Sequence, residues 1–92
     1  MRIYLQTQPQ AGESPKYCQL LLEQDLFGGW SLVREWGQPG TRPSLKREQY
    51  LHFEQAQEAL EKARDAQVKR GFRIMFSQGA EVPMGLKVPG DD

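Results

Sequence analysis

Apolar and polar residues alternate along several short stretches of the chain, a pattern typical of strands that bury one face. The clearest stretch is 16–24, where apolar residues occupy every even position from Cys18 to Leu22. Residues 25–29 contain a glycine pair suited to a sharp reversal, so we expect them to join 16–24 as a hairpin to 30–36, the central strand. The other stretches predicted as extended are 1–5, 44–50 and 72–76.

A helical period replaces this alternation after His52, although no strong amino-terminal cap marks the start. Apolar side chains then recur every three or four positions within about 140° of arc, and acidic side chains gather on a separate arc that we interpret as a solvated face. The apolar positions are Phe53, Ala56, Ala59, Leu60, Ala63 and Ala66. Basic residues at 69–70 suit the helix dipole, and Gly71 ends the helix.

These elements predict an α+β fold, a single small domain in which an antiparallel sheet carries one long amphipathic helix. We expect this domain to span residues 1–76. The remaining stretch, 77–92, is rich in glycine and proline and is expected to be a flexible tail, with 82–88 as a candidate edge segment.

The end of the central strand leaves two alternatives open. Strict alternation puts Arg34 on the same side as Trp30 and Trp36, an awkward place for a charge. Either the strand end is twisted or bulged, or the arginine stem lies over apolar neighbours with its guanidinium in water. Trp36, at the lip of the turn 37–43, is either wedged into the core or held out as a flat contact surface.

Charge balances over the 92 residues, with 12 lysines and arginines against 12 aspartates and glutamates. The molecule as a whole therefore has no net field to attract nucleic acid, membranes or acidic partners. The stretch 34–47 is uneven, because it holds four basic residues against the single acidic Glu35. The four basic residues are Arg34, Arg42, Lys46 and Arg47.

The sequence offers little for catalysis or metal binding. It contains one cysteine and one histidine, Cys18 and His52, on separate elements, and no glycine-rich phosphate loop. Cys18 is more simply a small buried hydrophobe than a reactive thiol, and His52 a structural residue. We therefore expect neither an enzyme nor a metal or cofactor. With a single cysteine, no signal pattern and no long apolar run, we expect a cytoplasmic protein without membrane contact.

Residues 17–72 resemble the WGR domain, a module found in many poly(ADP-ribose) polymerases and in short stand-alone bacterial proteins. The matching motifs are DLFGGW over 25–30, LVREWG over 32–37 and KRGF over 69–72, at the end of an alanine-rich helix. The resemblance implies an antiparallel sheet with one helix packed against it. Family members attached to polymerases bind DNA at strand breaks, and their motif tryptophan packs against the sugar of a terminal nucleotide.

By position, the resemblance gives this role to Trp36, with Gly37 allowing close approach of a backbone. The family's next residue is normally arginine, and this chain has Gln38, which can donate a hydrogen bond to a phosphate but lacks charge. The apolar residue that follows is replaced by Pro39. Arg42 is a candidate to compensate for the missing arginine.

Two hypotheses follow. The first is a sequence-independent, non-catalytic DNA-binding module for duplex ends or strand breaks, and the second is a protein-interaction module that uses the same surface. The placement of the tryptophan and the family favour DNA, whereas the neutral charge and Gln38 favour a protein partner. The sequence does not determine the oligomeric state. The candidate binding residues are Trp36, Gly37, Gln38, Arg34, Arg42, Lys46 and Arg47.

Overall fold

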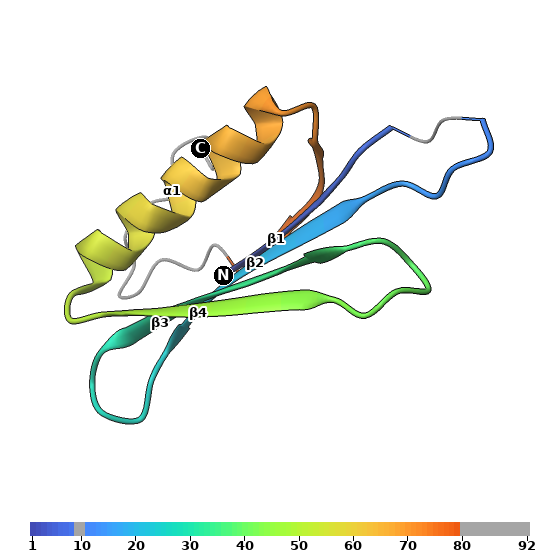
Figure 1. Cartoon of the computed structure of the whole chain (residues 1–92). Helices are drawn as coiled ribbons and strands as arrows, with labels where there is room; N and C mark the ends of the chain where they lie inside the picture. The colour runs from blue at the N-terminus through green and yellow to red at the C-terminus, as the bar shows by residue number, and fades with distance from the viewer. Residues whose placement is uncertain (9–10, 80–92) are drawn as a thin grey trace.

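A five-stranded antiparallel sheet with one helix forms the architecture of the computed structural model, which describes residues 1–8 and 11–79 (Figure 1). The order of strands in the sheet is β4-β3-β2-β1-β5. The α+β class and the antiparallel sheet predicted from the sequence are therefore confirmed. The elements are β1 (Arg2–Gln6), β2 (Tyr17–Gln24), β3 (Trp30–Gly37), β4 (Ser44–Tyr50), α1 (Phe53–Lys69) and β5 (Arg73–Gln78).

The helix connects the two edges of this sheet. Strands β1 to β4 follow one another as antiparallel neighbours, which places β4 at one edge. The chain then passes through α1 and returns as β5, paired with β1 at the other edge. Figure 1 shows α1 lying across one face of the sheet. Its last turn consequently lies far from β4 and close to the start of β5.

The core lies between α1 and the sheet face beneath it. In the β2–β3 pair, Leu22 lies opposite Leu32 and Leu20 opposite Arg34, so the even positions of both strands face the helix. The Trp30 ring meets the Phe53 ring edge-on, with 4.8 Å between centroids. The buried apolar residues are Ile3, Leu5, Cys18, Leu20, Leu22, Leu32, Ala56, Leu60 and Ala63. Ala66, predicted to face the core, is exposed.

The hairpin predicted over 25–29 is closed by its own hydrogen bonds. The Asp25 carboxylate accepts the backbone N–H groups of Phe27 and Gly29 at 2.8 and 2.9 Å. Gly29 is buried, and a Cβ at this position would lie 2.8 Å from the carbonyl oxygen of Tyr50. The glycine is therefore required by the close approach of the hairpin to the end of β4.

Strand boundaries differ from the prediction by one or two residues, since β1 spans Arg2–Gln6 rather than 1–5 and β5 spans Arg73–Gln78 rather than 72–76. The helix begins at Phe53 with a cap that the sequence pattern did not reveal, because the Gln55 side chain accepts the His52 N–H at 3.2 Å. Strand β5 continues through Gln78, so the first two residues of the predicted tail belong to the sheet. The rest of that tail from residue 80 onward, including the candidate edge segment 82–88, lies outside the described residues.

Candidate functional site

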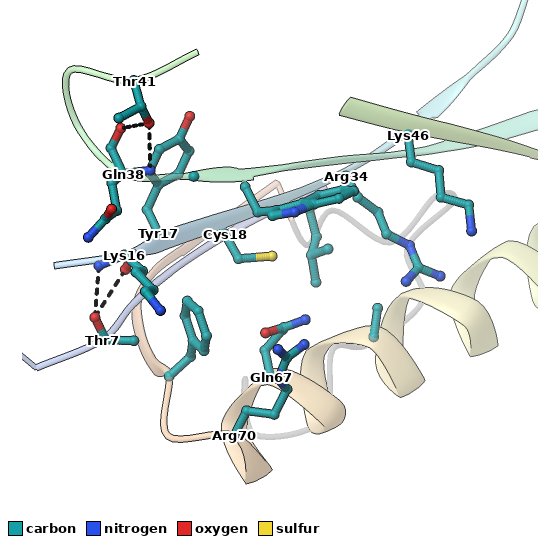
Figure 2. A pocket seen from close by; sticks show the side chains of 15 residues that line it. Thr7, Lys16, Tyr17, Cys18, Arg34, Gln38, Thr41, Lys46, Gln67 and Arg70 are labelled. Atoms are coloured by element: carbon teal, nitrogen blue, oxygen red, sulfur yellow. Dashed lines mark hydrogen bonds between the residues drawn. The ribbon is translucent and has the colours of Figure 1, made fainter. Parts of the chain in front are cut away.

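A cleft of about 700 Å³ opens between the sheet and the C-terminal half of α1. It lies where β2 begins and β3 ends, beside the loop that follows β3 (Figure 2). Volumes of this order are typical of ligand-binding clefts in proteins. Its lining consists of Thr7, Lys16, Tyr17, Cys18, Leu20, Arg34, Trp36, Gly37, Gln38, Thr41, Lys46, Ala63, Gln67, Arg70 and Phe72.

Four cations line this cleft: Lys16, Arg34, Lys46 and Arg70. They come from separate parts of the chain, and Figure 2 shows Gln67 and Arg70 extending from α1 toward the strand that carries Cys18. Among the lining residues that the structure describes there is no carboxylate. A cleft lined by one sign of charge focuses the field, so this neutral molecule has a locally positive site.

Arg34 is held in the cleft by a carboxylate from the neighbouring strand. Its Nη2 lies 2.8 Å from Oε1 of Glu48, whose other oxygen lies 3.7 Å from Nζ of Lys46. The β2–β3 register contains no bulge at Arg34, and its side chain is 30% exposed. Neither sequence alternative describes it fully, because the guanidinium is paired with Glu48 rather than left in water. One carboxylate thus offsets part of the charge of two cations.

Lys16 and Arg70 are the cations whose charge is most available. In residues 1–8 and 11–79, neither forms an ion pair. The backbone of Lys16 is fixed, since its N–H donates to Oγ1 of Thr7 at 2.8 Å and its carbonyl accepts the Thr7 N–H at 2.8 Å. Arg70 follows the last residue of α1, where a cation also complements the helix dipole.

Trp36 lines the cleft and is 41% exposed. Its backbone lies opposite Cys18 on β2 and Ser44 on β4, so the residue sits near the end of three paired strands. The sequence left open whether the Trp36 ring is wedged into the core or held out as a contact surface. Its exposure matches the second placement. Phe72, half-buried, supplies a second aromatic ring to the lining.

The turn after Trp36 is fixed by hydrogen bonds around Gln38. The Thr41 hydroxyl donates to the Gln38 carbonyl at 2.7 Å, and the Gln38 side-chain amide donates to the carbonyl of Ser14 at 3.3 Å. Gln38 therefore links this turn to the connection between β1 and β2. At Gly37 an added Cβ would make only ordinary contacts, the nearest at 3.5 Å from Cα of Pro43, so the fold itself leaves room for a side chain there.

Tyr17 and Cys18, adjacent on β2, both titrate above their ordinary ranges. The Tyr17 hydroxyl donates to Oε2 of Glu35 at 2.7 Å, and this hydrogen bond to a carboxylate is the main reason that its pKa rises to about 12. Burial raises the pKa of the Cys18 thiol, which is 3% exposed. Cys18 is thus a protonated, buried side chain, as the sequence indicated, and not a reactive thiol.

Comparison with known families decides what kind of domain carries this cleft. The model of the WGR domain family matches residues 1–77, which is most of the chain. The chain belongs to the WGR domain family. WGR domains are in general a nucleic-acid-binding type of module, and the family is non-catalytic. Comparisons with curated proteins and with solved structures found no match.

In this WGR domain, five of the seven candidate binding residues lie together in the cleft. These are Trp36, Gly37, Gln38, Arg34 and Lys46. The other two are not part of its lining. Arg47 lies opposite Val33 on β3, and because side chains alternate along β4 it lies on the sheet face away from α1. Arg42 is exposed in the loop after β3.

Sequence reasoning missed Lys16, Arg70 and Phe72 as members of this WGR site. Lys16 comes immediately before β2, and the pairing of Tyr17 with Gly37 brings it to the same end of the sheet as Trp36. Arg70 and Phe72 reach the cleft because α1 crosses the sheet toward β5. The KRGF motif could have pointed to Arg70 and Phe72. Their position near Trp36, however, depends on the direction in which α1 crosses the sheet, which the sequence does not give.

Residues 1–8 and 11–79 contain neither a metal-binding cluster nor a membrane-spanning helix. No group of three or more His, Cys, Asp or Glu side chains is positioned to hold a metal ion there. Over the same residues, the one helix is too short and too polar to cross a membrane.

Proposed function

We propose that this WGR domain is a non-catalytic DNA-binding module that holds duplex ends or strand breaks without reading their sequence. In this proposal the Trp36 ring lies against the terminal nucleotide, and the cleft cations neutralise the phosphates next to it. The same proposal places the protein in the bacterial cytoplasm, where it would meet DNA. The observation that carries it is an exposed tryptophan in the lining of a cleft that also contains four cations.

Each part of this cleft has a physical role in the proposal. Stacking of a nucleotide on an aromatic ring contributes about 1–3 kcal/mol and tolerates any base. Lys16 and Arg70, free of ion pairs among the described residues, are placed to contact phosphates, and Lys46 is held only at 3.7 Å by Glu48. Phosphate contacts position a nucleic acid without specifying its sequence, which supports recognition of ends rather than of a base pattern.

The helix supports this choice because it is poorly suited to enter a DNA groove. One side of α1 packs on the sheet through Ala56, Leu60 and Ala63. Its exposed residues include Glu54, Glu58, Glu61 and Asp65, which would repel phosphates. The contacts that remain for DNA are those of the cleft and the loops beside it.

A protein partner at the same surface is the second candidate function. Two observations favour it: Gln38 replaces the charged residue of the family motif and is bonded to Ser14, and Glu48 offsets the charge of Arg34 and Lys46. A protein surface would use the exposed ring of Trp36 and require fewer free cations. This alternative predicts that the protein binds no DNA duplex.

The two functions are separated by titrating fluorescent short duplexes, with and without a 5′-phosphate, against the wild type and Trp36→Ala. We expect Trp36→Ala to weaken binding roughly tenfold, the size of one lost stacking contact. If about four phosphates are neutralised, wild-type affinity falls on the order of a hundredfold between about 50 and 200 mM salt. Leu45→Ala, at an exposed apolar residue outside the cleft lining, is the matched control and should bind like the wild type.

Two results would argue against DNA binding through this cleft. If Trp36→Ala and the wild type bind duplexes with equal affinity, the tryptophan is not part of the site. If wild-type affinity does not change with salt, phosphate neutralisation is not the source of binding.

A further inference from the structure

The tip of the β2–β3 hairpin exposes two large apolar side chains side by side. Leu26 is 95% exposed and Phe27 is 93% exposed. The turn beneath them is closed, because the Asp25 N–H donates to the Gly29 carbonyl at 2.9 Å and the Asp25 carboxylate accepts two backbone N–H groups. A fixed turn that presents leucine and phenylalanine to water, with no contact to the core, is typical of a docking element.

The same end of the molecule carries a third exposed apolar residue and several acidic side chains, together with the N-terminal ammonium, which donates to the Leu22 carbonyl at 3.1 Å, and Arg2, which lies opposite Leu21. Leu51, 75% exposed, lies in the β4–α1 turn, next to Tyr50, whose backbone pairs with Trp30. Figure 1 shows this turn and the β2–β3 hairpin at one end, and the β3–β4 loop at the other. Neither 17–33 nor 49–61 contains a lysine or arginine. The acidic residues in these stretches are Glu23, Asp25, Glu54, Glu58 and Glu61.

The opposite end of the same molecule is aromatic and positively charged. Its cleft, of about 700 Å³, contains the aromatic residues Trp36 and Phe72 and four cations, of which Arg34 and Lys46 share Glu48 while Lys16 and Arg70 form no ion pair among the described residues. A space of that size can admit a leucine and a phenylalanine side chain. The acidic apolar tip and the cationic aromatic cleft are thus complementary in both charge and polarity.

We propose that copies of this chain associate head to tail, with the Leu26–Phe27 tip of one copy in the cleft of the next. The Phe27 ring packs against Trp36 and Phe72, and Glu23 and Asp25 lie near Lys16 and Arg70. Tip and cleft are at opposite ends, so the contact does not close on itself and further copies can add. The association does not depend on DNA binding, but it occupies the same cleft and competes with DNA there.

Such a contact should be weak. A hairpin tip entering a cleft buries less than the roughly 1,200 Å² typical of stable complexes. Self-association is therefore expected only at high protein concentration. Since opposite charges contribute, it should weaken as salt is added, whereas a purely apolar association would not.

Sedimentation velocity of the pure protein, without DNA, tests this arrangement. The wild type should show a weight-average sedimentation coefficient that rises with concentration and does not stop at a dimer. Phe27→Ser removes the aromatic side chain of the tip, and Trp36→Ala removes an aromatic ring from the cleft. Each should lower the association constant roughly tenfold or more. Met75→Ser, at an exposed apolar residue on β5, is the matched control and should associate like the wild type.

An equal mixture of Phe27→Ser and Trp36→Ala is the decisive sample. One variant keeps an intact cleft and the other an intact tip, so the mixture should recover association that stops at a dimer. A symmetric tip-to-tip contact would instead leave Trp36→Ala associating normally, and the mixture would gain nothing.

A second cleft variant, Lys16→Glu with Arg70→Glu, guards against misfolding of Trp36→Ala and should also remain monomeric. Wild-type protein that stays monomeric at every concentration, or a mixture that does not recover association, would overturn the proposal. Neither result depends on whether the protein binds DNA, so the two proposals fail separately.

Discussion

Arg34 and Trp36 occupy the same side of β3, but different neighbours determine their roles. Arg34 lies opposite Leu20 and is stabilised by Glu48, while Trp36 lies nearer the strand end with its ring partly in water. Alternation in the sequence placed both on one side. It could not identify Glu48 as the partner of Arg34, because that contact depends on the β3–β4 register.

Tyr17 offers a prediction at the scale of one side chain. Glu35 raises its pKa to about 12, from a usual value of 10.0, because the hydrogen bond favours the protonated phenol. This contribution to stability is complete below pH 10 and is lost as the pH rises toward 12, where the folded phenol ionises. We expect Glu35→Gln to return the Tyr17 pKa toward its usual value, as measured by NMR titration of the labelled tyrosine ring.

Tyr50, whose pKa is raised mainly by burial and not by Glu35, is the internal reference for this titration. Its resonance should change little with the substitution. A Tyr17 pKa that is the same in Glu35→Gln as in the wild type would show that the hydrogen bond to Glu35 does not control it.

At the scale of elements, helical periodicity located α1 well because a continuous run of apolar positions faces the sheet. The prediction for Ala66 was wrong for a geometric reason. The line of inward residues continues from Ala63 to Gln67, both in the cleft lining, so Ala66 lies to one side of it. Strand β5 was harder to delimit, since all six of its residues are exposed and its sequence shows no clear alternation.

Leu60 tests how strongly α1 is held on the sheet. It is 1% exposed and lies in the middle of the helix, within the core cluster. Leu60→Ala removes buried methyl groups and leaves a cavity, so we expect the free energy of unfolding to fall by about 2–5 kcal/mol in urea denaturation.

Val68→Ala, at an exposed position of the same helix, is the control and should change the free energy of unfolding by less than about 0.5 kcal/mol. Equal effects of the two substitutions would contradict the packing described for α1.

At the scale of the whole molecule, twelve positive and twelve negative side chains cancel in number but not in position. The sequence revealed an excess of cations over 34–47, yet the fold brings only Arg34 and Lys46 of these into the cleft lining. Lys16 and Arg70 join them through the β2–β3 register and the path of α1. Contacts of this kind are non-local, so the composition of a single stretch could not indicate them.

The central claim is that DNA binds in the cleft and not simply to surface cations. Arg70→Gln and Arg47→Gln test it directly, because each removes one arginine, the first from the cleft and the second from the opposite sheet face. Duplex affinity is measured over a range of salt concentrations for both variants. We predict that Arg70→Gln weakens binding and reduces the salt slope by about one, whereas Arg47→Gln leaves both unchanged. Equal losses in the two variants, or a loss only in Arg47→Gln, would contradict a binding site in the cleft.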